Sequence, residues 1–176
     1  MLAVRRGADV MNRRRLLVGL TAVFVLWVAL VAAFRSRHRP SIDLVRRFNR
    51  WILNPVMNWM AGRPGFYAAA IHHIGRTSGR PFTTPVIADP VPGGYAIPLP
   101  YGRTTDWCKN ALAAGGATLS LHGATLVLVE PEVVTFEQVV PHLTSQRARL
   151  YRLYRIDEFL RLKVLPATEH PVHRVE

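Results

Sequence analysis

Residues 75–81 form the stretch of the chain best suited to bind an anion. They read Gly-Arg-Thr-Ser-Gly-Arg-Pro, and the two glycines permit backbone angles that a side chain would forbid. Arg76 and Arg80 carry forked cations that match phosphate or carboxylate groups. Thr77 and Ser78 add hydroxyl donors, and consecutive amides in such a turn can form a concave nest for an anion. The sequence predicts an anion-binding loop here, and a surface hairpin with solvated arginines is the alternative. A Walker loop is excluded, because the Lys-Ser/Thr pair that ends one is absent.

A metal site is not expected from the histidines or the cysteine. His72 and His73 are adjacent, so in a strand their side chains point to opposite faces and cannot chelate one ion together. His122 precedes a turn glycine and is expected to be exposed. Cys108 is the only cysteine, which excludes an intramolecular disulfide and a cysteine-cluster metal site. We expect it to be a small buried hydrophobic residue rather than a nucleophile, because no base accompanies it.

Strand-like segments flank the loop and would hold it in place. Five such segments are bounded by turn residues, and we expect them to form a meander. Pro98 and Pro100 lack amide donors, so the third strand should be an edge strand, be bulged, or be opened toward a ligand. The five segments span residues 66–74, 83–88, 95–99, 117–121 and 125–129.

Helical segments are expected between and after these strands. A short helix over residues 105–114 would end at Gly115, a normal C-terminal stop. After Pro131 a helix would begin with Thr135 as its cap and Gln138 near its first turn. A basic amphipathic helix is then predicted from about residue 146 to residue 163. Tyr151, Tyr154 and Phe159 are spaced nearly as one face of this helix would require. They are expected to pack in the core, and the alternative is that they line an entrance for the acceptor.

An uncharged run of nineteen residues, 16–34, is long enough to cross a bilayer. As a helix it reaches roughly 28 Å, against a hydrocarbon thickness of about 30 Å. A cleaved signal peptide is the competing interpretation, but its apolar core typically has only about 7–15 residues. We therefore favour an uncleaved transmembrane anchor. Arginines flank the run on both sides, so the positive-inside rule does not decide its orientation.

The composition divides the chain into three parts. Residues 1–40 hold a basic flank and the anchor, residues 41–65 an amphipathic helix and a Gly-Arg-Pro-Gly linker, and residues 66–176 the folded domain. The helix would lie along an anionic membrane surface or pack on the domain. Of the net charge of +12, the first 40 residues carry +7, from eight arginines against Asp9, and the rest of the chain carries +5. Nucleic acid is not expected as a partner, because no basic-aromatic recognition motif accompanies this charge.

Three separated motifs resemble the deazaflavin-dependent nitroreductase family. They read Ile-Gly-Arg-Thr-Ser-Gly-Arg-Pro-Phe-Thr-Thr-Pro at residues 74–85, Pro-Tyr-Gly at residues 100–102, and Asp-Trp-Cys-Lys-Asn-Ala-Leu-Ala-Ala-Gly-Gly at residues 106–116. The resemblance covers roughly residues 66–134. It implies a mainly β (α+β) fold, a split β-barrel of the flavin-reductase type with about five to six antiparallel strands and flanking helices, here preceded by the N-terminal transmembrane helix. It also implies coenzyme F420, an 8-hydroxy-5-deazaflavin that carries a phosphate and a polyglutamate tail.

The same resemblance implies which residues meet the cofactor. The loop would contact the phosphate, the strand after it would flank the deazaflavin ring, and the third strand's end and the short helix would complete the pocket. Tyr101 and Tyr67 are the candidate catalytic donors to an acceptor oxygen, with packed aromatic residues as the alternative. The expected cofactor-binding residues are Arg76, Thr77, Ser78, Gly79, Arg80, Pro85, Val86, Pro100, Gly102, Arg103, Trp107 and Asn110.

The chain departs from the family pattern at two positions. Thr77 stands where many relatives have lysine, and no lysine lies beside Gly102. Arg103 would compensate for the second loss. Without that compensation the affinity for the cofactor tail should be weaker, since each charge-assisted hydrogen bond contributes about 1.5–3 kcal/mol.

Taken together, these features predict a membrane-anchored oxidoreductase. It would transfer a hydride from reduced F420 to a small apolar acceptor such as a quinone or a nitro compound, with the lipid bilayer as a partner. Because F420 is made and reduced in the cytoplasm, the resemblance implies a catalytic domain on the cytoplasmic side of the cell membrane. The alternatives are a noncatalytic carrier of a deazaflavin, flavin or lipid-like ligand, and an FMN-dependent reductase on the same barrel.

Overall fold

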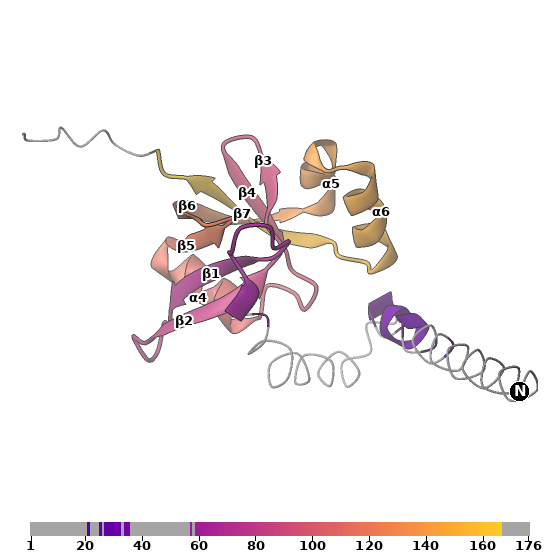
Figure 1. Cartoon of the computed structure of the whole chain (residues 1–176), viewed down its shortest axis with the longest axis horizontal. Coiled ribbons are helices and arrows are strands. Elements are labelled where there is room, and N and C mark those ends of the chain that lie inside the picture. The colour runs from indigo at the N-terminus through magenta and orange to yellow at the C-terminus, as the bar shows by residue number, and fades with distance from the viewer. Residues whose placement is uncertain are drawn as a thin grey trace, which may run out of the picture.

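The computed structural model describes residues 21, 25, 27–32, 34, 35, 57 and 59–166. Its centre is one antiparallel sheet with the strand order β2-β1-β5-β6-β7-β4-β3 (Figure 1). The seven strands are β1 (Ala69–Ile74), β2 (Pro81–Val86), β3 (Asp89–Val91), β4 (Gly94–Pro98), β5 (Gly116–Leu121), β6 (Ala124–Thr135) and β7 (Glu158–Val164).

The sheet is curled into a barrel-like form. Its two edge strands, β2 and β3, are consecutive in the chain, and only residues 87 and 88 separate them. Three Cα steps span at most roughly 11 Å, whereas seven flat strands spaced about 4.8 Å apart would put the edges about 29 Å from each other. The edges must therefore approach each other, which confirms the expected mainly β, barrel-like fold with flanking helices, although the described sheet has seven strands rather than the expected five to six.

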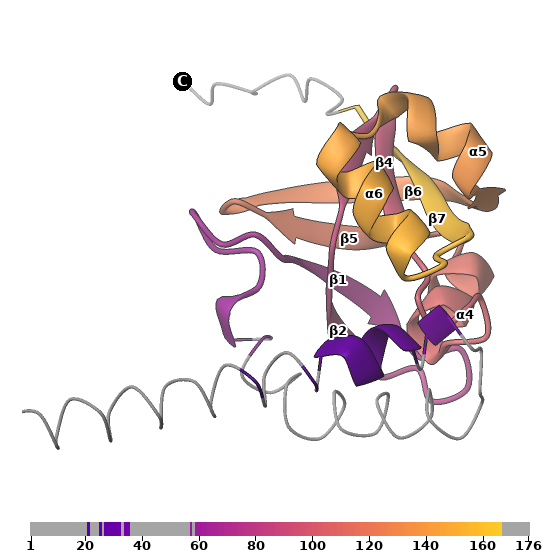
Figure 2. The same ribbon diagram turned by 90° about the vertical axis from the view of Figure 1, so that its right-hand side faces the viewer.

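Two clusters of buried side chains hold the fold together. The first lies inside the curl, where Ile71, Leu119 and Leu128 of β1, β5 and β6 share one face. The second lies beneath the helices α5 (Phe136–Val139) and α6 (Ser145–Leu153). Figures 1 and 2 show these two helices together on one side of the sheet, whereas α4 (Asp106–Ala114) lies apart from them. Because α4 contacts β1 and β5, it is the helix that can support the loop after β1.

The predicted helix over residues 146–163 is wrong in its second half. Helix α6 ends at Leu153, Arg155 adopts a left-handed φ of 51°, and β7 follows. This strand lies between β6 and β4, with Phe159, Leu160 and Leu162 fully buried. The local pattern of basic and apolar residues also suits a helix, but burial of the apolar residues between two strands decides the outcome. Phe159 therefore does not continue a helical stripe from Tyr151 and Tyr154.

The expected edge position of the third strand is also wrong. Strand β4 lies between β3 and β7. However, β3 reaches only as far as Ala96, so Ile97 and Pro98 pair with β7 alone. Pro98 thus occupies a position where the missing amide donor breaks no ladder on the β3 side.

Two helix boundaries follow the sequence patterns closely, whereas β6 continues six residues past its predicted end at residue 129 and β3 was not predicted. Helix α4 ends at Gly115, whose φ is 68°, and the backbone amide of Thr135 donates to the Gln138 side chain at 2.8 Å, as a capping residue should. Both helix predictions are confirmed. Residues 66–68 are not part of β1, and β2 does not pair with β3, so the chain is not a simple meander.

The predicted linker at residues 62–65 packs on the barrel. The amide of Gly123, in the β5–β6 turn, donates to the Gly62 carbonyl at 2.7 Å. A Cβ at Gly62 would lie 2.8 Å from that of Ser120, and the φ of Gly62 is 80°. Only glycine suits this close approach of two backbones.

The N-terminal run is described only in part, and the predicted helix after residue 40 lies outside the described residues. Within the described set, no helix combines the length and the apolar character needed to cross a bilayer. Residues 27–32, 34 and 35 are helical. The ring of Phe34 lies 5.7 Å from both Tyr101 and Tyr154. Arg155 donates to the Arg35 carbonyl at 2.9 Å, so this segment touches the barrel beside the turn after β4.

Candidate functional site

The predicted anion loop is the turn between β1 and β2. The Gly75 amide donates to the Arg80 carbonyl at 2.9 Å, and the Gly79 amide donates to the Gly75 carbonyl at 2.8 Å. A Cβ on Gly75 would lie 2.5 Å from Ser78 Oγ and 2.7 Å from the Phe82 ring. Gly79 has a φ of 64°. Both glycines are therefore required for this turn, one for space and one for its backbone angle.

Arg76 braces the loop against α4. Its Nη1 donates to Asn110 Oδ1 at 2.9 Å and to Asp106 Oδ1 at 3.2 Å, and its backbone amide donates to Asn110 Oδ1 at 3.1 Å. The Arg76 side chain is about one-third exposed, at 35%. The guanidinium thus has two protein acceptors already, so its first role is to hold the loop against the start of the helix.

A buried chain of polar groups continues from this brace into the barrel. Asn110 Nδ2 donates to His73 Nδ1 at 3.1 Å, and His73 Nε2 lies 3.2 Å from Thr84 Oγ1. Asn110 and His73 are both buried, and the His73 ring stacks on Phe82. Asn110 therefore ties the helix to strand β1.

The polar chain determines the protonation state of His73. Since the Asn110 amide nitrogen can only donate, His73 Nδ1 must accept, and the neutral ring carries its proton on Nε2. Burial lowers the pKa of His73 from its usual value; Asp106 opposes this shift, and His72 adds to it. The network is thus built for the neutral imidazole.

The loop also has hydrogen-bond donors that could bind a ligand. Among the described residues, the amides of Thr77 and Ser78 donate to no backbone acceptor, and both side chains are exposed. Arg80 is exposed too, and no acidic side chain in the described part of the chain pairs with its guanidinium. Two amides, two hydroxyls and one free guanidinium can together bind an oxyanion.

The residues predicted to flank the cofactor ring are spread over both faces of the sheet. Val86 pairs with Ala69 and packs on the inner core, whereas Pro85 pairs with Ala70 on the opposite face. Trp107 also packs against the inner core. The position of Pro85 differs from that of Val86 because successive strand residues point to opposite faces.

The turn after β4 carries the remaining predicted residues. Pro100 and Tyr101 are half-buried, and the Gly102 amide donates to the Leu99 carbonyl at 2.9 Å with a φ of 77°. Arg103 Nε lies 3.5 Å from Glu158 Oε1. Arg103 thus already has an acidic neighbour, although its side chain is 66% exposed.

Tyr67 is separated from the loop. It precedes β1, is 61% exposed, and its hydroxyl lies 4.0 Å from Met57 Sδ. Seven residues lie between Tyr67 and Gly75, and the six-residue strand β1 among them alone spans about 20 Å. Tyr67 and the loop are therefore at opposite ends of this strand.

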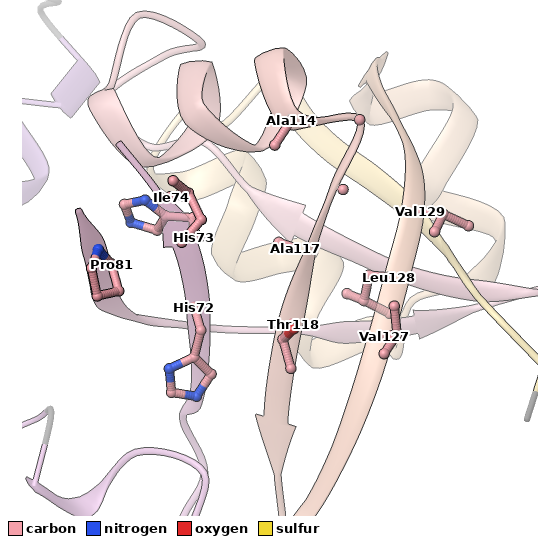
Figure 3. A pocket seen from close by; sticks show the side chains of 12 residues that line it. His72, His73, Ile74, Pro81, Ala114, Ala117, Thr118, Val127, Leu128 and Val129 are labelled. Atoms are coloured by element: carbon pink, nitrogen blue, oxygen red, sulfur yellow. The ribbon is translucent and has the colours of Figure 1, made fainter. Parts of the chain in front are cut away.

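A hollow of about 380 Å³ lies beside the loop, on the sheet between β1, β5 and β6. Figure 3 shows Ile74, Thr118 and Val127 around it, with Ala114 of α4 at one end. It meets the loop only through the flanking residues Ile74 and Pro81, and no predicted site residue lines it. His72 borders it but is already bonded, to Thr83 Oγ1 at 3.0 Å and Ser120 Oγ at 2.9 Å.

Three residues of the polar chain were not among the predicted site residues: Asp106, His73 and Thr84. Asp106 begins the third motif and stands in the first turn of α4. His73 and Thr84 share the inner face of the β1–β2 hairpin, because Thr84 pairs with Ile71 and Phe82 with His73. A polar residue at an inward strand position is the sequence signal that could have found His73 and Thr84.

Buried Cys108 matches its expected role. The thiol is fully buried, and burial together with Glu158 raises its pKa to about 11. It is therefore protonated at neutral pH and unsuited to act as a nucleophile.

Comparisons with known proteins find only weak similarity. No family model and no curated protein matches the chain. Among solved structures, the protein Atu2129 of unknown function from Agrobacterium tumefaciens str. C58 is 18% identical with a TM-score of 0.42, over 56% of this chain and 48% of that one. An F420-H2 dependent reductase, FDR-A, is 15% identical with a TM-score of 0.35, over 54% of this chain and 93% of that one. The chain thus spans about half the length of Atu2129, and these scores are too low to assign a function.

Proposed function

We propose that the protein is an oxidoreductase that binds reduced coenzyme F420 and transfers its hydride to a small apolar acceptor, such as a quinone or a nitro compound. The observation that carries this proposal is the loop between β1 and β2. Its amides, its hydroxyls and Arg80 would bind an oxyanion, and the bonds of Arg76 to Asp106 and Asn110 hold the loop against α4. The three sequence motifs that resemble the deazaflavin-dependent family lie at this loop, at the turn after β4, and along α4.

The donor set suits the acidic part of such a cofactor. Thr77, Ser78, Gly79 and Arg80 would hold the phosphate, with Arg76 behind them as the brace. The deazaflavin, when bound, supplies the hydride, so the protein needs no acid–base pair for the transfer itself. Its task is to hold the ring beside the acceptor and to exclude water.

The turn after β4 would receive the acceptor. Pro100, Tyr101 and Gly102 form this turn, and the Tyr101 hydroxyl would donate a hydrogen bond to the acceptor oxygen as negative charge develops there. Phe34, the last residue of the apolar run, lies 5.7 Å from the Tyr101 ring. An acceptor dissolved in a membrane would therefore meet this turn where the apolar segment joins the barrel.

The N-terminal run would anchor the protein in the cell membrane. Its described residues include Val25, Trp27 and Val28, which are 60%, 44% and 44% exposed, whereas Val31 is buried. Exposed apolar side chains on a helix are costly in water and favourable in lipid. The catalytic domain would lie on the cytoplasmic side, where reduced F420 is available.

A titration with oxidised F420 tests the proposal. Full-length protein in detergent should quench the fluorescence of F420 at stoichiometric ratios, and reduced F420 should then be oxidised at a rate that depends on added menadione. Tight binding without oxidation would instead favour a noncatalytic carrier. Preference for FMN over F420 in the same titration would favour a flavin-dependent reductase.

A further inference from the structure

The polar chain from Thr84 to Arg76 leaves no position for a second proton on His73. Asn110 Oδ1 accepts from both the amide and the guanidinium of Arg76, which fixes the orientation of the Asn110 side chain. Its Nδ2 then faces His73 Nδ1 at 3.1 Å as a donor. A proton on Nδ1 would place two donors against each other.

Rotating the Asn110 amide does not relieve this conflict. The flipped amide would offer Oδ1 to the protonated His73, but it would turn Nδ2 toward the two Arg76 donors. His73 and Asn110 are buried, so a donor left unpaired between them cannot be solvated without movement, whereas the Arg76 side chain is 35% exposed. Protonation of His73 must therefore break the bond to Asn110 or the brace to Arg76.

The charged groups around His73 are few. Asp106 faces it from α4 and favours its protonation, while His72 on the same strand opposes it. Arg76 lies one hydrogen-bonded residue away, beyond Asn110. Strands β2 and β5, which flank β1, contain no charged residue. Burial then leaves the neutral ring favoured near neutral pH.

We propose that His73 is a positioning residue for the anion loop: its neutral ring holds Asn110, Asn110 holds Arg76 alongside Asp106, and protonation of the ring loosens Asn110 and weakens anion binding. This proposal rests on the proposed function only for the identity of the anion. The loop, the brace and the tautomer belong to the fold itself.

Two near-isosteric substitutions separate this role from simple packing. His73→Gln can accept from Asn110 and donate to Thr84 without titrating. Asn110→Asp can still accept from Arg76, but it presents a carboxylate to His73 Nδ1, so it favours the protonated ring. The first should make the loop independent of pH, and the second should keep the loop braced at lower pH.

The experiment follows both the loop and the ligand with the full chain in detergent micelles. Nitrogen-15 NMR should show His73 as the Nε2–H tautomer at pH 7.5, and the Arg76 amide signal should shift as His73 titrates. The Kd for oxidised F420 should rise roughly three- to tenfold as His73 becomes protonated below pH 6.5, the equivalent of about one hydrogen bond. In the His73→Gln variant the Arg76 signal should not shift with pH, and the Kd should follow only the titration of F420 itself.

Each measurement can overturn the proposal. An Nδ1–H tautomer, or an Arg76 signal that shifts with pH equally in the wild type and in His73→Gln, would disprove the positioning role. The proposed effect on binding would be disproved if the wild-type Kd depended on pH in the same way as the Kd of His73→Gln or of Asn110→Asp. If no variant binds F420 at any pH, the proposed function fails, and the NMR result alone decides the role of His73.

Discussion

Arg76 and Arg80 have the same side chain but different surroundings. Arg76 is paired with Asp106 and Asn110, whereas Arg80 is exposed at the tip of the hairpin without an acidic partner among the described residues. A guanidinium already bonded to a carboxylate has less to gain from a ligand than one that faces water. We therefore expect Arg76 to support the loop and Arg80 to bind the anion.

Arg80→Ala should weaken F420 binding without loss of stability. We expect the Kd to rise about tenfold or more, since a charge-assisted hydrogen bond contributes about 1.5–3 kcal/mol. Arg149→Ala is the matched control, because it removes another exposed arginine, from α6. Fluorescence titration measures the Kd and thermal melting the stability. Equal affinity of the two variants would contradict the assignment of Arg80.

The buried carboxylate of Asp89 ties the edge strand β3 to helix α6. Asp89 of β3 accepts from the Tyr151 hydroxyl of α6 and pairs with Arg147 Nε at 3.2 Å. Asp89 is buried, and burial together with the bond to Asp89 raises the pKa of Tyr151. A buried carboxylate is tolerated only when it is paired and hydrogen-bonded, so this contact contributes to stability rather than to binding.

Tyr151→Phe should destabilise the fold by about 1–3 kcal/mol, because Asp89 loses one of its donors while buried. Chemical denaturation gives the free energy of unfolding. Tyr154→Phe serves as the control, since the contact of this tyrosine with Phe34 is between rings. A larger loss in Tyr154→Phe than in Tyr151→Phe would show that the hydroxyl of Tyr151 contributes little.

At the scale of the element, strand β7 has the largest effect on the architecture. It joins β6 to β4, so it connects the half of the sheet that carries the loop to the half that carries β3. The residues around it were predicted as part of a helix, because basic and apolar residues alternate in a way that suits both structures. These residues form a strand rather than a helix because they pair with two strands, β6 and β4, that are distant in the sequence.

Leu160→Ala should cost about 2–5 kcal/mol in the free energy of unfolding, because Leu160 is fully buried in the inner core. Leu165→Ala is the matched control just beyond β7, where the side chain is 49% exposed, and should change stability by less than about 0.5 kcal/mol. Urea denaturation followed by tryptophan fluorescence compares the two. Similar losses would argue against β7 as a central strand.

At the scale of the whole molecule, the buried His73 makes stability depend on pH. Burial lowers its pKa in the folded chain below the usual value of 6.5, so the unfolded chain binds this proton more tightly. The contribution to stability is full above about pH 6.5 and is lost as the pH falls below that value. Acid therefore favours unfolding through this residue.

The melting temperature should accordingly fall between pH 7.5 and pH 5.5 in the wild type. His73→Gln should flatten this dependence, since the amide does not titrate. His122→Gln is the control, because His122 is exposed in the β5–β6 turn and should leave the profile unchanged. Identical profiles for the wild type and His73→Gln would contradict a neutral buried ring.

The apolar run is the other feature that acts on the whole molecule. If it anchors the protein, the full chain should remain in the membrane fraction after a high-salt or alkaline wash. The double substitution Val25→Asp and Val28→Asp should release it, since each aspartate costs about 2.5–3.5 kcal/mol at the centre of a membrane helix. The control is Arg149→Ala, which changes charge outside the run. Release of the wild-type chain by salt alone would contradict an anchor.

Features that depend on neighbouring residues could be predicted from the sequence. The glycine-bounded loop, the helix that ends at Gly115, the cap at Thr135 and the opposite faces of His72 and His73 all follow from backbone angles and strand periodicity. These are local interactions, so a short window of residues contains their cause.

Tertiary structure alone decided the features that depend on distant partners. It converted residues 158–164 into a central strand, made Arg76 a brace, and placed His73, Asn110 and Thr84 in one buried chain of hydrogen bonds. The bonds of this chain join residues 11 to 37 positions apart. Their geometry appears only when the sheet has curled and α4 has packed on β1, since burial and pairing across the fold outweigh local propensity.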